Sequence, residues 1–305
     1  MRRDSNTVLF VLALGLMGVV AAPHEAGAQA WVPGARWLST SLGYQYLESD
    51  QHLFSVEDPA TGSNELDLGA IKSQLVSMSF DYGVTNRLAI SGGVAFISSE
   101  YNGQDPDNPV IDNGSWNSDF QDLALSVRYN ALVAPVALTP SISFGMPTNN
   151  YETLGHAAVG GHLSSLGLGL SAGWSPRRWL EGAFVHANYT YSFVEDVEGI
   201  SLNRSNASGQ VGYYILPSLS AGAFIGYAHV HGGVDWAHDL TEHNFHSHDR
   251  GAATESTSVG GGLSYVFTRR STLSLSYSTI LAGVSSNTHN AHGFMLTNTW
   301  NFSGL

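Results

Sequence analysis

The sequence predicts an all-β protein, a single antiparallel, up-and-down transmembrane β-barrel of about twelve strands that follows an N-terminal signal peptide. Three observations predict this fold. Apolar residues alternate with small polar residues along most of the chain, which is the period of a strand with two different faces. Short and long connectors alternate between these segments. Charged residues make up 12% of the sequence, against about 25% in an average soluble protein.

The N-terminal residues have the three parts of a secretory signal peptide. A basic pair, Arg2-Arg3, precedes an apolar segment at 8–20, and small residues follow with Ala-x-Ala cleavage triplets within 26–30. The apolar segment is too short to span a membrane as a helix. We therefore expect 1–28 to be a signal peptide and 29–305 to be one outer-membrane barrel domain.

The alternation also indicates where each strand face points. The clearest case is 165–174, where leucines alternate with serine and glycine. In a soluble sandwich the polar face would meet water and would carry many charges. Here that face carries mainly serine, glycine, alanine and threonine. We infer that the apolar faces meet lipid and that the small polar faces line an interior.

Twelve segments follow this pattern, and each is near the length of about 9–11 residues that a tilted spanning strand needs. They are 37–47, 72–83, 87–99, 118–130, 135–146, 163–174, 180–193, 205–216, 218–231, 256–268, 272–283 and 293–302. The long connectors are 48–71, 100–117, 147–162, 194–204, 232–255 and 284–292. Outer-membrane barrels sort their connectors in this way, with short periplasmic turns and long external loops. The expected location is therefore the bacterial outer membrane.

Composition excludes several classes of partner and chemistry. The chain has 25 acidic and 12 basic side chains and no cysteine, which excludes nucleic acid as a partner and also excludes disulfides and thiol chemistry. Trp300 and Phe302 lie near the end of the last strand, which resembles the signal read by the barrel-insertion machinery. The expected partners are that machinery, outer-membrane lipid with lipopolysaccharide, and a small-molecule solute.

Three motifs in the middle of the chain occur in a fixed order: DFQDLAL at 119–125, GMPTNNY at 145–151 and FVHANYTY at 184–191. This order resembles the outer-membrane barrels grouped as the phenol meta-pathway degradation (MetA-like) transporter family. The resemblance covers about a quarter of the chain, and Gln121 and Asn149 stand where the family pattern has glycine. It implies a barrel that passes small hydrophobic or aromatic compounds.

Ionisable side chains on inward positions are the candidate lumen and selectivity residues. They are Asp81, Asp122, Arg128, Glu181 and His186. Such charges form either a constriction that selects solutes or a structural network across the lumen, and the sequence leaves both interpretations open. The acidic long loops favour cations at the mouth and predict a cation-leaning pore. Passive passage of a small solute is the leading function, with no cofactor.

A second hypothesis makes the protein a surface binding protein for a divalent metal. The long connector 232–255 contains His238, His243, His246 and His248 together with acidic residues. Neutral imidazoles and carboxylates suit Zn²⁺, Ni²⁺ or Cu²⁺, but the spacing matches no specific metal motif. An ordinary solvated external loop explains the same residues.

A third hypothesis is a lipid-modifying barrel enzyme, because His162 and Ser164 lie two residues apart on the expected lipid face. A hydrolase also needs a third residue that orients the imidazole. The outward positions of the neighbouring strand 180–193 provide neither asparagine nor a carboxylate. We therefore expect that the protein is not an enzyme.

Overall fold

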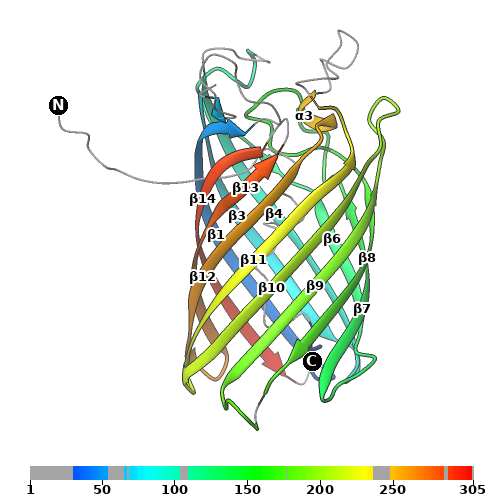
Figure 1. The fold of residues 1–305 in the computed structure, drawn as a ribbon, viewed down its shortest axis with the longest axis vertical. Helices are drawn as coiled ribbons and strands as arrows, with labels where there is room; N and C mark the ends of the chain where they lie inside the picture. Colours follow the sequence, from blue (N-terminus) through cyan, green and yellow to red (C-terminus); the bar gives the residue numbers. More distant parts are fainter. Residues whose placement is uncertain are drawn as a thin grey trace, which may run out of the picture.

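The first long strand, β1 (Trp37–Leu53), pairs antiparallel with the last strand, β14 (Thr288–Ser303), and this seam closes the sheet into a barrel (Figure 1). The computed structural model describes residues 30–53, 65–66, 69–103, 109–176, 178–235, 248–284 and 288–303. The sheet has 14 strands, and two of them are very short, β2 (Glu65–Leu66) and β5 (Asn117–Phe120). The other wall strands are β3 (Gly69–Gly83), β4 (Leu88–Gly103), β6 (Leu123–Tyr129), β7 (Val136–Met146), β8 (Ser165–Trp174), β9 (Ala183–Val194), β10 (Leu202–Leu216), β11 (Leu219–Gly232), β12 (Glu255–Thr268) and β13 (Ser271–Val284).

Long connectors lie at one end of the barrel and short turns at the other (Figure 1). The last strand ends at the short-turn end, whereas the four-residue helix α3 (His248–Gly251) lies among the long connectors. Among the described residues, no helix is long and apolar enough to cross a membrane.

The outer face of the wall is apolar and exposed. Side chains from many strands are exposed there by more than a third, including Leu42, Met78, Ile142, Leu168, Leu170, Ile225, Leu263, Leu275 and Leu296. A continuous apolar belt of this kind is incompatible with a water-soluble monomer and matches the lipid-facing band of an outer-membrane barrel. The seam leaves no free sheet edge in the wall, as lipid requires. The predicted twelve-strand barrel and its outer-membrane location are confirmed.

The ends of several strands differ from the sequence prediction. Strand β1 continues to Leu53 instead of ending at residue 47, and β14 begins at Thr288 instead of residue 293. The two strands are both longer than predicted because they pair with each other along the added residues, as far as Leu53 and Thr288 at the long-connector end of the seam. The predicted signal peptide, 1–28, lies outside the described residues.

The predicted strand 118–130 is divided into β5 and β6 by a bulge. On the neighbouring strand β4, Phe96 pairs with Phe120 and Gly93 pairs with Ala124, so three steps on β4 face four steps on the divided strand. The extra residue breaks the alternation. As a result Gln121 and Asp122, although consecutive, both direct their side chains into the barrel, where each contacts the same connector.

Small hydroxyl side chains cover much of the inner face and bond in pairs across neighbouring strands. Ser73 and Ser99 form one such pair with 2.7 Å between their oxygens, Ser91 and Ser126 form another at 2.7 Å, and Ser264 and Ser274 a third at 2.8 Å. Each hydroxyl can both donate and accept a hydrogen bond, so the two hydroxyls of a pair bond to each other. The inner face of the wall is therefore polar but uncharged.

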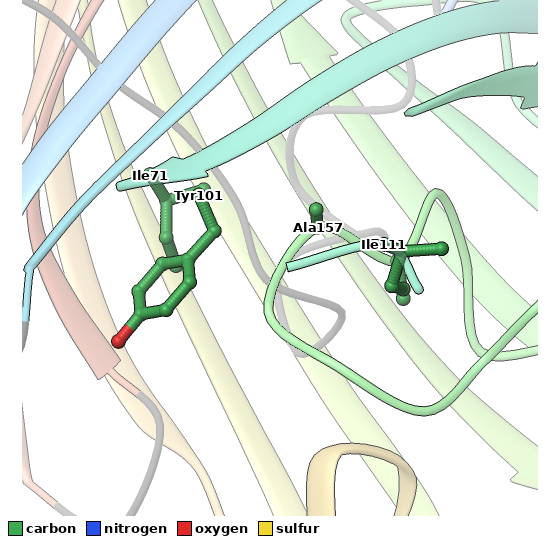
Figure 2. Close-up of a cluster of buried hydrophobic side chains, with 5 residues drawn as sticks. Ile71, Tyr101, Ile111 and Ala157 are labelled. Carbon is green, nitrogen blue, oxygen red and sulfur yellow. The ribbon is translucent and has the colours of Figure 1, made fainter. Parts of the chain in front are cut away.

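The long-connector end is filled from inside. Ile71 and Tyr101 project inward from β3 and β4 and pack with Ile111 and with Ala157 from two connectors (Figure 2). The second of these connectors was predicted to be an external loop at 147–162, and that prediction is wrong for its buried part. We call residues 151–163 the plug. The apolar inward residues of β3 and β4 explain its position, because without the plug they would face water.

Candidate functional site

The plug is anchored to the wall through Tyr151. The Tyr151 ring packs against Leu75, Ile97 and Val159, and its hydroxyl donates a hydrogen bond to Asp122. The same hydroxyl accepts a hydrogen bond of 3.0 Å from the backbone N–H of residue 162. The plug is thus connected to the wall at the bulge by one aromatic side chain that is both packed and hydrogen-bonded.

Two further contacts fix the plug. Gln121, the other residue of the bulge, donates from Nε2 to the carbonyl of Val159 at 2.7 Å. Glycine is required at Gly160, because a Cβ there would overlap the Tyr151 hydroxyl. From the opposite side, Arg250 of α3 donates from Nε to the carbonyl of Gly161 at 3.0 Å.

Burial changes the acidity of Tyr151 in the plug. Burial and the hydrogen bond to Asp122 both raise the pKa of the Tyr151 hydroxyl. The phenol therefore stays protonated and remains a donor at neutral pH.

A polar belt lies nearer the short-turn end. Arg128 of β6 and Asp81 of β3 form an ion pair, with 2.5 Å between Nη2 and Oδ2. His186 of β9 pairs in register with Gln210 of β10, and both face inward. His186 Nε2 and Gln210 Oε1 are buried, and neither has a hydrogen-bond partner among the described residues.

The chain before β1 enters the barrel at the short-turn end. We call residues 30–36 the strap. Ala30 is fully buried, and its carbonyl accepts hydrogen bonds from Thr139 Oγ1 at 2.7 Å and from Asn130 Nδ2 at 3.0 Å. Asn130 also donates to Thr139 Oγ1 at 2.7 Å, so the three groups form one buried network.

The rest of the strap crosses to the end of β3. The Trp31 ring lies over Gly173 of β8, where an added Cβ would be 2.6 Å from the ring. At the far side, the backbone N–H of Arg36 donates to the carbonyl of Gly83 at 2.7 Å. The strap therefore runs from the β7–β8 wall to the β3 end and narrows this mouth of the lumen.

Between the plug and the strap the lumen is open. Ala124 of β6 and Ser208 of β10 face inward, because they have the same parity along their strands as the inward-facing Arg128 and Gln210. Both are exposed although they lie inside the wall. An inward-facing side chain far from both mouths of the barrel is exposed only where no other side chain fills the lumen beside it. The middle of the barrel therefore contains free space.

Four of the five predicted lumen residues face inward, and the structure joins two of them. Asp81 and Arg128 contact each other, Asp122 belongs to the plug anchor, and His186 lies in the polar belt. Glu181 lies in the turn before β9 and is exposed, so it does not join this group. Their roles in selectivity stay predictions.

Sequence reasoning missed Arg204, Tyr151 and the strap. Arg204 was assigned to the connector 194–204, whereas β10 begins at Leu202. Side chains alternate between the two faces of a strand, so Arg204 shares the inward face of Gln210 if the strand is extended back to it. Tyr151 lies in a motif of the family resemblance, but in an expected external loop.

The predicted metal ligands cannot be assembled from the described residues. His238, His243 and His246 lie outside them, and His248 begins α3 with a side chain that is not described. Within the described ranges, no group of three or more histidine, aspartate or glutamate side chains is arranged to hold a metal ion. The metal hypothesis for the loop stays a prediction.

The His162 and Ser164 pair does not share a lipid-facing surface. The His162 ring packs edge-on against Tyr151 inside the barrel, with 5.4 Å between ring centroids. The backbone N–H of Ser164 instead donates to Glu195, and this bond lowers the pKa of the Glu195 carboxyl. The predicted outward position of His162 is wrong, because the chain turns inward at the plug.

Comparison with known proteins supports the fold. No protein-family model matches the chain, and no curated protein sequence matches it. Among solved structures, the COG4313 outer membrane channel from Pseudomonas putida F1 is 15% identical, with a TM-score of 0.67 over 90% of this chain and 98% of that one. The translocator domain of autotransporter NalP from Neisseria meningitidis is 13% identical, with a TM-score of 0.52 over 88% and 90%. At these identities the likeness shows a shared barrel fold.

Proposed function

We propose that the protein is a passive outer-membrane channel for small solutes with a hydrophobic or aromatic part. The observation that carries the proposal is the open middle of the lumen, where the inward residues Ala124 and Ser208 are exposed. A barrel whose only role was structural would gain from filling this space with side chains. Free space bounded by the plug and the strap instead suits a solute that occupies the lumen transiently between two constrictions.

The lining fits an amphipathic solute. Serine pairs and the polar belt offer hydrogen bonds, and the buried Nε2 of His186 and Oε1 of Gln210 have no described partner. Nearer the long-connector end, the half-buried Ala95 packs against the apolar cluster around Leu75 and Tyr151. Buried polar atoms without a protein partner are normally satisfied by water or by a ligand.

One likeness supports a channel, and another supports the class of solute. The barrel of this chain is similar in fold to a solved outer membrane channel. The motifs at 119–125, 145–151 and 184–191 resemble the MetA-like family, in which passage of small hydrophobic or aromatic compounds is expected. Two of these three motifs meet in the plug anchor, since Asp122 binds Tyr151.

Liposome swelling with purified, refolded protein tests this function. Swelling should be faster with small aromatic alcohols than with sugars of equal size, and it should exceed that of protein-free liposomes. Replacing Ala124 with Trp should slow it by filling the open section, whereas Val127→Trp, on the lipid face of the same strand, should leave it unchanged. Equal swelling with and without the protein, for every solute, would contradict the proposal.

A further inference from the structure

Arg204 projects from β10 into the lumen near the long-connector end, and none of the described residues is its counter-ion. It pairs in register with Ser192 of β9 and Val230 of β11, and it has the same inward parity as Gln210. Its Nε is buried and has no hydrogen-bond partner within the part of the chain that the structure describes. No described carboxylate lies within ion-pair distance of its guanidinium, and no described residue accepts a hydrogen bond from it.

A guanidinium in this position is costly to leave unpaired. The free-energy cost of removing a charged group from water without a partner is large compared with the stability of a whole domain. Asp122 attracts Arg204 from a strand on another side of the lumen. The Asp122 carboxylate, however, is already held by the Tyr151 hydroxyl, and the two charges remain apart.

The surroundings of Arg204 are apolar on the long-connector side. Leu202 on the same strand and Val230 on the neighbouring strand pack with Leu163 of the plug and with Val197 in one buried cluster. Arg204 therefore stands where this apolar cluster gives way to the polar lumen below. A ligand held there would place one anionic group on the guanidinium and an apolar body against the cluster or the plug.

We propose that Arg204 binds the carboxylate of a small apolar or aromatic acid, as a subsite inside the lumen. A carboxylate fits the planar fork of a guanidinium with two parallel hydrogen bonds, and it brings one charge that neutralises Arg204. This inference rests on the proposed channel function and narrows its solutes to monocarboxylates with an apolar body.

Calorimetric titration of benzoate into the full-length mature protein, folded in detergent micelles, tests this subsite. Wild-type protein should bind benzoate, and Arg204→Gln should weaken binding by about tenfold or more, which corresponds to about 1.4 kcal/mol. Arg204→Lys should give an intermediate affinity, since it keeps the charge but loses the fork. Benzyl alcohol, which lacks the charge, and chloride, which lacks the apolar body, should both bind more weakly than benzoate.

Controls separate the subsite from general effects of charge and folding. Arg270→Gln removes an exposed positive charge in the short turn between β12 and β13, outside the lumen, so it should leave benzoate affinity nearly unchanged. Each variant should keep the gel-mobility shift on heating that marks a folded barrel. Benzoate affinity that is equal in wild type and Arg204→Gln would overturn the proposal, as would equal affinity for chloride.

Planar-bilayer recording separates failure of the subsite from failure of the channel. If the channel function is correct, Arg204→Gln should still conduct KCl, and benzoate should reduce the wild-type current more than the variant's current. Benzoate binding without any conductance would support the subsite and contradict the channel. Conductance that benzoate affects equally in both proteins would contradict the subsite alone.

Discussion

Thr139 Oγ1 donates a hydrogen bond of 2.7 Å to the carbonyl of Ala30, a residue 109 positions earlier in the chain. The two residues meet inside the barrel, because Thr139 faces inward on β7 and the strap enters through the short-turn mouth. The contact therefore ties the start of the chain to the wall of the lumen.

Freeing the strap should widen the short-turn mouth. The double variant Asn130→Ala with Thr139→Ala removes both donors to Ala30 and should weaken strap docking by about 1–3 kcal/mol. Single-channel conductance should rise and fluctuate more than in wild type. Ser143→Ala, on the inner face of the same strand β7, removes a hydroxyl away from the strap and serves as the control. Unchanged conductance in the double variant would show that the strap does not limit flow.

The ion pair between Arg128 and Asp81 should stabilise the barrel. Asp81→Asn leaves the largely buried Arg128 without this carboxylate and should lower the free energy of unfolding by about 2–3 kcal/mol. The effect is smaller than for a fully buried pair, because the Asp81 side chain is 23% exposed. Urea unfolding in lipid measures this, and Asp81→Asn with Arg128→Gln should recover part of the loss. Additive losses in the double variant would exclude coupling between the two residues.

Ion selectivity should depend on Arg204. The acidic loops predict a cation-leaning pore, whereas Arg204 is a positive charge inside the lumen with no ion-pair partner among the residues that the structure describes. The reversal potential across a KCl gradient should therefore show a stronger cation preference in Arg204→Gln than in wild type. An anion preference in both proteins would contradict the predicted effect of the loops.

The sequence predicted the wall well and the inside of the barrel poorly, for a physical reason. The two faces of each strand meet environments of different polarity, lipid outside and the lumen inside, and this difference produces the period-two alternation. The alternation therefore placed Asp81, Arg128 and His186 on inward positions. The bulge at Gln121 and Asp122 adds one residue and is invisible to a periodic pattern. It places two consecutive side chains inside.

The plug and the strap depend on contacts between segments that are distant in the chain. Tyr151 is buried because Leu75 and Ile97 line β3 and β4, and no local pattern around Tyr151 reports those residues. The same is true of Ala30 and Thr139. Arg204 was missed because the predicted strand begins at residue 205, whereas β10 begins three residues earlier, at Leu202.

The seam between β1 and β14 has a consequence for how the barrel is completed. A slip of one residue between the two strands would turn the oily side chains of one of them into the lumen. Inside the seam, Ser39 donates to Asn301 at 2.6 Å and Ser41 bonds with Thr299 at 2.8 Å. These two side-chain bonds form only when the first and last strands pair in the correct register. They therefore favour that register when the two strands pair and close the barrel during assembly in the membrane.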